Sequence, residues 1–251
     1  MPQVIKHAWL PAPDSAGSVR LFCFPHAGGN SSAFSSWPQY LPACVTVKAV
    51  DLPGRQRRFR EPPFERMAPL VQSLVRELRP SLKSPLALFG HSFGALIAFE
   101  FAREMLRNGL PKPSHLFVSS FPAPQLPQRH VNLHNLTPHL FRERALSLLP
   151  HQVASNEEFL NVVLPVLRAD WEIFETYEYT PGPPLDCPIT ALSGASDLNV
   201  RNNDLKQWDQ QTTSNFNLQL FPGKHDYLQD KPEPVLQFIA TTLQAITDRS
   251  G

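Results

Sequence analysis

The chain has 251 residues, of which 42% are hydrophobic, and its formal net charge is +1. This length suits one α/β domain, residues 1–251, better than two domains, and the hydrophobic content is enough to build a core around a sheet. A charge so close to neutral gives no general affinity for nucleic acid or an anionic membrane, and no stretch approaches the length of a membrane span. We therefore expect neither kind of partner.

The N-terminus and the cysteines indicate a cytoplasmic protein. Residues 1–7 lack the apolar segment of a secretory signal. The three cysteines, Cys23, Cys44 and Cys187, are an odd number near predicted strands, as in proteins that keep their thiols reduced. We expect Cys23 to be buried within a strand and not to act as a nucleophile.

Short apolar runs alternate with helical patterns along most of the chain. Strands are predicted at residues 4–9, 19–24, 45–50, 86–90, 115–120, 188–193 and 216–221. Helices are predicted at residues 67–79, 93–107, 204–210 and 233–246. Such alternation is typical of an α/β fold with a mostly parallel sheet that helices cover on both faces.

One long segment, residues 121–186, breaks this alternation. It begins and ends with proline-rich sequence, and helical patterns run from Leu136 to Leu149 and from Phe159 to Tyr177. A segment of this length is too long for a simple loop. We interpret it as a helical lid inserted into the domain, over the active site.

The pentapeptide Gly90-His91-Ser92-Phe93-Gly94 matches the G-x-S-x-G pattern. An apolar strand-like run, residues 85–89, precedes it, and a strong helix-forming run, residues 95–105, follows it. On such a sharp strand-to-helix turn the serine hydroxyl is exposed, and flanking glycines let neighbouring chain pass closely. The hydroxyl also lies at a helix N-terminus, which favours developing negative charge. We predict that Ser92 is a catalytic nucleophile.

A nucleophilic serine needs a base, and in α/β-hydrolases the order along the chain is serine, acid, histidine. Among the nine histidines, His225 lies in a loop directly after a strand-like run, residues 216–221. The other histidines after Ser92 precede or fall within a proline-rich middle region, away from any strand end. His225 is therefore the predicted base.

Asp197 is the predicted acid, because it lies in a turn at the end of the strand-like run 188–193. There it would hold the imidazole in the required tautomer and stabilise the imidazolium. A second common position for the acid, after residues 115–120, is vacant. The competitors are Asp204, which we expect to open a helix as an N-cap, and Asp226, whose side chain we expect to point away from the adjacent histidine.

An oxyanion hole needs one backbone N–H from the residue after the nucleophile and another from the loop after an early strand. Phe93 follows Ser92, and the strand at residues 19–24 leads into Pro25-His26-Ala27-Gly28-Gly29. Glycines allow close backbone approach there, although an ordinary glycine-rich turn would look the same. We predict that Phe93 and Ala27 supply the two N–H groups.

Five motifs together carry a family resemblance. They are Phe24-Pro25-His26-Ala27-Gly28-Gly29, Asp51-Leu52-Pro53-Gly54-Arg55, Gly90-His91-Ser92-Phe93-Gly94-Ala95, Leu167-Arg168-Ala169-Asp170-Trp171 and Phe221-Pro222-Gly223-Lys224-His225. In this order they resemble a type II thioesterase, the stand-alone editing thioesterase of nonribosomal peptide and polyketide synthases. The resemblance runs from about Leu21 to about Ile239. One departure is Lys224-His225-Asp226, where such proteins often have a second glycine before the histidine and an aromatic residue after it.

The resemblance implies an α/β-hydrolase fold and hydrolysis of an acyl thioester from the phosphopantetheine arm of an acyl or peptidyl carrier domain. The usual role is to remove stalled or wrongly primed acyl groups so that a synthase can restart. We expect no metal and no cofactor other than the partner's phosphopantetheine, and a monomer. The residues by themselves indicate only serine acyl transfer, through an acyl-enzyme that water then attacks.

Two sets of residues have roles that the sequence leaves open. Aromatic residues recur at helical spacing in the lid, at Trp171, Phe174 and Tyr177. Such a pattern is either packing or the lining of an acyl chamber. Four arginines follow the Leu52-Pro53-Gly54 turn, and either form a solvated face or meet an acidic carrier domain or its phosphate. The docking candidates are Arg57, Arg58 and Arg60, whereas Arg55, which belongs to a family motif, is an alternative brace for its loop.

Other functions share these residues. A medium-chain acyl thioesterase of fatty acid synthesis has the same motifs, and a small-molecule carboxylesterase or lipase uses the same chemistry. A pseudo-enzyme would bind carrier domains without catalysis, but an intact Ser92, Asp197 and His225 argues against it.

Overall fold

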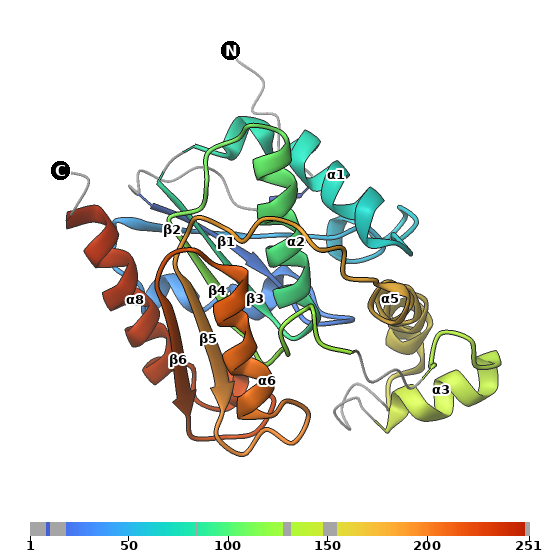
Figure 1. Ribbon diagram of the computed structural model, residues 1–251. Helices are drawn as coiled ribbons and strands as arrows, with labels where there is room; N and C mark the ends of the chain where they lie inside the picture. Colours follow the sequence, from blue (N-terminus) through green and yellow to red (C-terminus); the bar gives the residue numbers. More distant parts are fainter. Residues whose placement is uncertain (1–8, 11–18, 84, 128–131, 148–154, 249–251) are drawn as a thin grey trace, which may run out of the picture.

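The computed structural model describes residues 9–10, 19–83, 85–127, 132–147 and 155–248 (Figure 1). Within these residues, six parallel strands form one sheet in the order β2-β1-β3-β4-β5-β6. The strands are β1 (Val19–Phe24), β2 (Val45–Ala49), β3 (Leu86–His91), β4 (His115–Ser119), β5 (Ile189–Gly194) and β6 (Phe216–Phe221). All six were expected, each within one residue at either end. The additional strand expected at residues 4–9 falls almost wholly outside the described residues.

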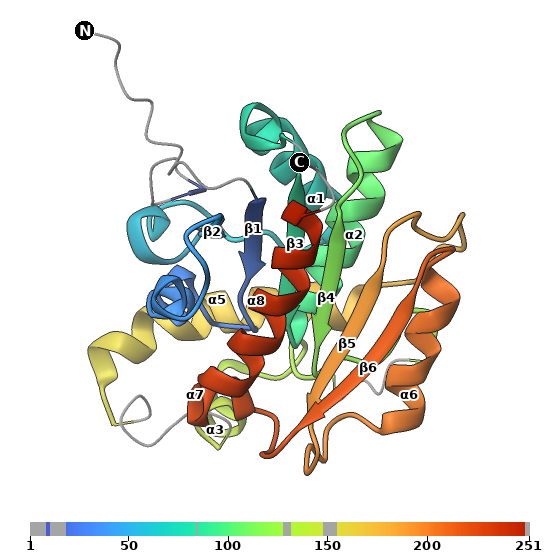
Figure 2. The same ribbon diagram turned by 90° about the vertical axis from the view of Figure 1, so that its left-hand side faces the viewer.

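Helices cover both faces of the sheet, as expected (Figures 1 and 2). They are α1 (Met67–Leu78), α2 (Phe93–Arg107), α3 (Pro138–Leu146), α5 (Glu157–Thr176), α6 (Asn202–Lys206), α7 (Tyr227–Asp230) and α8 (Pro232–Asp248). The helix expected at 204–210 is in fact two shorter pieces, α6 and a 3-10 helix, Gln207–Gln211. In the described ranges, no helix is both long and apolar enough to cross a membrane.

The core has two parts, one on each face of the sheet, because successive strand side chains point to opposite faces. On β1, Phe22 and Phe24 pack with α1 and α2, whereas Leu21 and Cys23 pack with α8. The four central strands, β1, β3, β4 and β5, are buried on both faces and therefore read as nearly continuous apolar runs, whereas the edge strands β2 and β6 are partly exposed. Cys23 is a buried free thiol of this core, as expected.

The segment between β4 and β5 contributes α3 and α5, which lie at the end of the sheet toward which the strand arrows point (Figures 1 and 2). The two expected lid helices are confirmed, although residues 148–149 of the first lie outside the described residues. Helix α5 begins where Asn156 accepts a hydrogen bond from the N–H of Phe159 (3.0 Å), and Glu157 and Glu158 lie in its first turn, where negative charge is favourable.

Hydrogen bonds tie the first part of this insertion to α5. The Glu175 carboxylate accepts the backbone N–H groups of Leu133 (2.7 Å) and His134 (3.0 Å). Arg168 donates to the carbonyl oxygens of His134 (2.7 Å) and Leu136 (2.8 Å). These contacts join residues 133–136 to α5; that the insertion moves as a lid stays a prediction.

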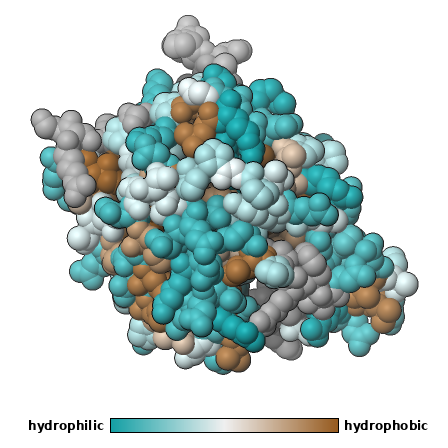
Figure 3. Space-filling model, viewed as in Figure 1, coloured by the Kyte–Doolittle hydropathy of each residue, from teal (hydrophilic) through white to brown (hydrophobic). Residues whose placement is uncertain are grey.

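The face of the molecule seen in Figure 3 is mostly hydrophilic, with hydrophobic residues in separate small areas. Large hydrophobic side chains that reach solvent include Leu140 on α3 and Phe159 and Val162 on α5. Such scattered exposure is normal for a protein surface.

One buried histidine on β4 links the fold to pH. The His115 ring stacks on Phe117 with ring centroids 4.3 Å apart, and its Nε2 lies 2.9 Å from Thr190 Oγ1. Burial lowers the pKa of His115 to about 4. In the unfolded chain the His115 imidazole therefore binds a proton at a higher pH than it does in the folded protein. The contribution of neutral His115 to the free energy of unfolding is fully present above pH ~6.5 and is lost as the pH falls toward about 4.

His115→Gln removes this titration and keeps a hydrogen-bonding side chain opposite Thr190. Between pH 6.5 and pH 4, we expect the free energy of unfolding to fall by about 3 kcal/mol less in the variant than in the wild type. Urea titrations at several pH values in this range measure the difference. His139→Gln, at an exposed residue of α3, is the matched control. Equal pH dependence in the wild type and in His115→Gln would contradict the prediction.

Candidate active site

Ser92 occupies the sharp turn between β3 and α2, with φ 53° and ψ −124°. A Cβ atom at Gly90 would lie 2.0 Å from the carbonyl oxygen of Gly94, and one at Gly94 would lie 2.1 Å from that of Phe24. Both flanking positions therefore need glycine, since no side chain fits between these backbones. The Ser92 N–H donates to the carbonyl oxygen of Ser119 (2.7 Å), which joins the turn to β4.

The structure brings the three predicted side chains together at the C-terminal edge of the sheet. His225 Nε2 lies 3.1 Å from Ser92 Oγ, and His225 Nδ1 lies 2.9 Å from Asp197 Oδ2. Asp197 follows β5 and His225 follows β6, so adjacent parallel strands deliver acid and base to one place. This is the geometry of a nucleophile, a base and a group that orients the base.

Close backbone packing fixes the acid relative to the base. A Cβ atom at Gly194 would lie 2.1 Å from the carbonyl oxygen of Lys224, so the loop before His225 passes directly over the end of β5. The N–H groups of Ala195 and Ser196 donate to the carbonyl oxygens of Phe221 (2.7 Å) and Gly223 (2.9 Å). Backbone contacts alone therefore join the loop after β5, which carries Asp197, to the loop after β6, which carries His225.

The Asp197 side chain is closed to solvent, whereas the His225 side chain is 24% exposed. Burial raises the pKa of Asp197, but the hydrogen bond and charge of His225, the Asn199 N–H and the Ser120 hydroxyl outweigh it, so the pKa lies below its ordinary value. The carboxylate is therefore ionised at neutral pH and can stabilise an imidazolium.

The two competing carboxylates lie elsewhere. Asp204 is within the first turn of α6, and Arg201 occupies the N-cap, so the expected N-cap role of Asp204 is wrong. Asp226 is exposed at the start of α7, and its charge acts on His26. In the described structure, Asp197 is the carboxylate hydrogen-bonded to His225.

In the loop after β1, some backbone N–H groups are hydrogen-bonded within the protein and others are not. Gly28, at φ +71°, donates its N–H to Asp170 Oδ2 (2.7 Å), and Gly29 donates to the carbonyl oxygen of His26 (2.9 Å). Within the described part of the chain, the Ala27 N–H has no acceptor. Phe93 is the first residue of α2, where an N–H has no intrahelical partner. Both N–H groups predicted for an oxyanion hole are thus left for a ligand; that role stays a prediction.

One neighbour of His225, His91, was missed by the sequence reasoning. The His91 ring centroid lies 5.2 Å from that of His225, and His91 Nδ1 lies 2.8 Å from Ser119 Oγ, which is 2.7 Å from the Tyr227 hydroxyl. Burial, then the neighbouring His225 and His26, lower the pKa of His91 well below its ordinary value. His91 is therefore neutral and supports His225 as packing. Its position directly before Ser92 in the G-x-S-x-G pentapeptide was the sequence signal that could have placed it near the catalytic histidine.

The lid aromatics divide between two places. The Trp171 and Phe174 rings lie 5.5 Å apart, and Phe174 contacts Phe121 (5.9 Å), which follows β4. The Tyr177 hydroxyl instead donates to Glu100 Oε1 on α2 (2.8 Å), and Tyr177 packs into the core. For Tyr177 the packing alternative holds, and a role of Trp171 and Phe174 in an acyl chamber stays a prediction.

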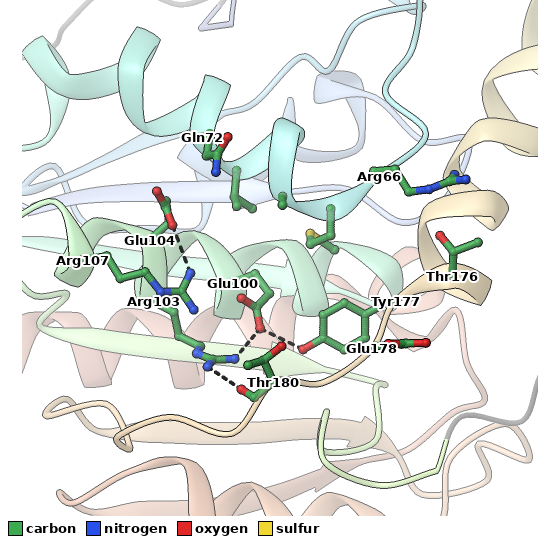
Figure 4. Close-up of a pocket in the computed structure, with 13 residues that line it drawn as sticks. Arg66, Gln72, Glu100, Arg103, Glu104, Arg107, Thr176, Tyr177, Glu178 and Thr180 are labelled. Atoms are coloured by element: carbon green, nitrogen blue, oxygen red, sulfur yellow. Dashed lines mark hydrogen bonds and ion pairs between the residues drawn. The ribbon is translucent and has the colours of Figure 1, made fainter.

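Figure 4 shows the cavity beside Tyr177, of about 300 Å³, between α1, α2 and residues 176–180. No triad residue lines it. Its buried charges satisfy one another, since Arg103 pairs with Glu100 (2.8 Å) and donates to the carbonyl oxygen of Thr180 (2.6 Å). The chemistry of the site is therefore not located there.

The arginine run also divides. Arg58 is buried: it binds the Glu61 carboxylate (2.6 Å) and the Asp51 carbonyl oxygen (3.1 Å), and lies 3.8 Å over the Trp9 ring. The expectation that Arg58 docks a partner is wrong, because its side chain is only 7% exposed and its guanidinium is already bonded within the protein. Arg57 and Arg60 are exposed and stay candidates.

Arg55 is buried against Asp170 of α5, which carries no role in the sequence analysis. Arg55 Nη1 and Nη2 donate to Asp170 Oδ2 (2.9 Å) and Oδ1 (2.8 Å), and Nη1 also donates to the carbonyl oxygen of Gly29 (2.9 Å). The alternative of Arg55 as a brace is confirmed. The presence of Asp170 in one of the five family motifs was the sequence signal that could have marked it as the partner of Arg55.

Asp197→Asn tests the assignment of the acid. We expect kcat for hydrolysis of an activated acyl ester to fall by about 10⁴-fold, since an amide cannot fix the same histidine tautomer. Asp204→Asn and Asp226→Asn are the matched controls, and each should keep kcat within about tenfold. A loss as large in Asp226→Asn as in Asp197→Asn would overturn the assignment.

Comparison with known proteins agrees with this geometry. The family model described as a thioesterase domain matches residues 19–243. Gramicidin S biosynthesis protein GrsT of Aneurinibacillus migulanus is 36% identical, over 93% of this chain and 92% of its own length. Thioesterase PikA5 of Streptomyces venezuelae is 39% identical, over 88% and 79%. The medium-chain S-acyl fatty acid synthase thioesterase of Homo sapiens is a weaker relative, 32% identical over 85% and 82%.

Solved structures extend the likeness to the fold. The RedJ thioesterase of the prodiginine pathway in Streptomyces coelicolor has a TM-score of 0.83 at 39% identity, covering 94% of this chain and 93% of its own. The type II thioesterase BorB of the borrelidin biosynthetic cluster also has a TM-score of 0.83, at 34% identity, covering 94% and 96%. With its sheet, its serine turn and its insertion in the expected places, the chain belongs to the thioesterase family as a type II thioesterase, an α/β-hydrolase that cleaves thioesters.

Proposed function

We propose that this thioesterase hydrolyses acyl groups from the phosphopantetheine arm of carrier domains, and so clears stalled or wrongly primed groups from a nonribosomal peptide or polyketide synthase. The observation that carries the proposal is the hydrogen-bonded line from Ser92 through His225 to Asp197. The near end-to-end similarity to GrsT, a gramicidin S biosynthesis protein, and to BorB, a type II thioesterase of the borrelidin biosynthetic cluster, supports the substrate class.

In the proposed reaction, Ser92 Oγ attacks the thioester carbonyl carbon while its proton passes to His225 Nε2. Asp197 accepts the Nδ1–H of His225 and stabilises the imidazolium. The carbonyl oxygen becomes an oxyanion that the N–H groups of Ala27 and Phe93 stabilise. When this intermediate collapses, the C–S bond breaks and the departing thiolate takes the proton from His225.

Water then completes the cycle. His225 Nε2 takes a proton from water as its oxygen attacks the ester carbonyl of the acyl-enzyme, and the same proton returns to Ser92 Oγ as the carboxylic acid leaves. The partial exposure of the His225 side chain supports this step, because water reaches the base without a large movement of the chain.

Ser92→Ala should lower kcat by several orders of magnitude while the fold and carrier binding remain. What survives in comparable triads is about 10³–10⁴ over the uncatalysed rate, from the oxyanion hole and binding. The measurement is single-turnover hydrolysis of an acyl-carrier substrate, with circular dichroism as the control for folding. Turnover like that of the wild type would refute the mechanism.

We propose that carrier domains are recognised through surface charge at Arg57 and Arg60. Both side chains are exposed, on the loop that Arg55 and Arg58 anchor from inside. Arginine pairs well with carboxylate and phosphate. An acyl pocket that is mainly apolar gains only about 1–3 kcal/mol of selectivity per methylene, so the carrier must provide much of the discrimination.

Arg57→Glu and Arg60→Glu should raise KM for acyl-carrier substrates several-fold and leave KM for the same acyl group on CoA nearly unchanged. The effect should shrink as salt rises, because exposed charges are screened. Arg79→Glu, at an exposed residue just after α1 and before β3, is the matched control. Equal losses on carrier and CoA substrates would remove these residues as a docking site. Preference for a fatty acid synthase carrier would favour the alternative function in fatty acid synthesis.

We also propose that the protein works as a cytoplasmic monomer. The three cysteines are free thiols, which supports a reducing compartment. Sedimentation of the purified protein tests the monomer, and a concentration-dependent increase in mass would contradict it.

A further inference from the structure

Three segments that are distant in sequence meet at one buried carboxylate. Asp170 on α5 accepts the N–H of Gly28 from the loop after β1 and two N–H groups of Arg55 from the loop after β2. The side chains of Arg55 and Asp170 are only 6% and 2% exposed. Both carboxylate oxygens are therefore bonded within the protein.

The contact between α5 and the loop after β1 is tight as well as polar. A Cβ atom at Gly28 would lie 3.2 Å from Leu167 Cδ1 and 3.8 Å from Val163 Cγ2, both on α5. Gly28 also has a left-handed φ of +71°, which fixes the direction in which the preceding peptide points. The position of α5 and the conformation of residues 26–29 are consequently linked.

We propose that Asp170 is a positioning residue for the oxyanion hole. By accepting the Gly28 N–H it orients the turn so that the Ala27 N–H, one residue earlier, stays unbonded and faces the reacting carbonyl. Arg55 donates to both oxygens of this carboxylate and to the Gly29 carbonyl oxygen, and so neutralises the buried charge. The lid helix thereby supplies part of the catalytic geometry, in addition to covering the site.

The inference rests on the proposed acyl transfer at Ser92 and not on the identity of the carrier. A small acyl thioester, such as an acyl group on N-acetylcysteamine, is therefore the substrate for its test. If carrier preference fails while the Asp170 effect holds, only the proposed carrier function falls.

Energetics suggest how to separate positioning from stability. Removing one partner of a buried ion pair leaves an uncompensated charge and costs several kcal/mol, whereas replacing both partners by apolar residues is often neutral. A single variant at either residue would therefore lose stability together with the contact under test. Paired variants avoid this difficulty.

The test compares R55M/D170N with R55M/D170L. Both remove the ion pair, but the asparagine side chain keeps a carbonyl oxygen that can accept the Gly28 N–H, whereas the leucine side chain has no acceptor. We expect R55M/D170N to keep kcat within about fivefold, and R55M/D170L to lose about 10²-fold in kcat with KM changed less than about threefold. Free energies of unfolding, measured in urea, should be similar for the two.

A second readout reports the oxyanion directly. An alkyl trifluoromethyl ketone accepts Ser92 Oγ at its carbonyl carbon, the proton passes to His225, and the carbonyl oxygen becomes an oxyanion. Its inhibition constant should rise in R55M/D170L in parallel with the loss of kcat, because transition-state analogues depend on the same contacts. A purely structural role would leave this constant unchanged in folded protein.

The matched control is E100L/R103M, which removes a second buried arginine–carboxylate pair, drawn in Figure 4. That pair contacts Tyr177 and Thr180 and no residue of the triad. We expect its kcat and inhibition constant to stay within about twofold of the wild type under conditions where circular dichroism shows it to be folded.

Equal kcat values in R55M/D170N and R55M/D170L, or a similar loss of kcat in the control, would overturn the proposal. Should R55M/D170L fail to fold, the single variants Asp170→Asn and Asp170→Ala repeat the comparison under conditions where circular dichroism shows both to be folded. The alanine variant should then lose at least about tenfold more kcat than the asparagine variant. Equal losses would again refute the positioning role.

Discussion

The backbone contacts around Ser92 constrain every other part of the site. Carbonyl oxygens of Phe24 and Gly94 lie where Cβ atoms of glycines 94 and 90 would otherwise be, so β1, β3 and α2 are joined without side chains between them. Ser92 keeps a positive φ of 53°, a conformation that residues other than glycine rarely adopt. Because the C-terminal ends of parallel strands lie at the same edge of the sheet, the loops after β1, β5 and β6 surround this fixed turn, and their side chains and N–H groups must be placed relative to Ser92.

Much of this arrangement could be predicted from the sequence, because its signals are local. Apolar runs identified the strands, since the central ones are buried on both faces, and the chain order of the α/β-hydrolases led to Asp197 and His225. The glycines at 90 and 94 were understood as a need for close backbone passage, which the structure bears out. These inferences needed only neighbouring residues and a known topology.

The failures involve side chains whose surroundings come from distant parts of the chain. Arg58 looked like a surface charge, but Trp9, Asp51 and Glu61 enclose it. Tyr177 is spaced like a lid aromatic, yet the end of α5 turns it toward Glu100 on α2. Asp204 has the residue type of an N-cap, but the helix begins earlier. Asp170 meets an arginine 115 positions away, and periodicity carries no trace of such a pairing.

The way α5 rests on the loop after β1 has a consequence for the engineering of such enzymes. The insertion between β4 and β5 is the natural part to exchange when a different acyl preference is wanted, as α3 and α5 look like a separable module. Leu167 and Asp170 of α5 nevertheless contact Gly28 in the loop after β1, and so help to fix the conformation of that loop. A chimaera that imports a foreign insertion must therefore retain this pair of side chains, or specificity and turnover will change together.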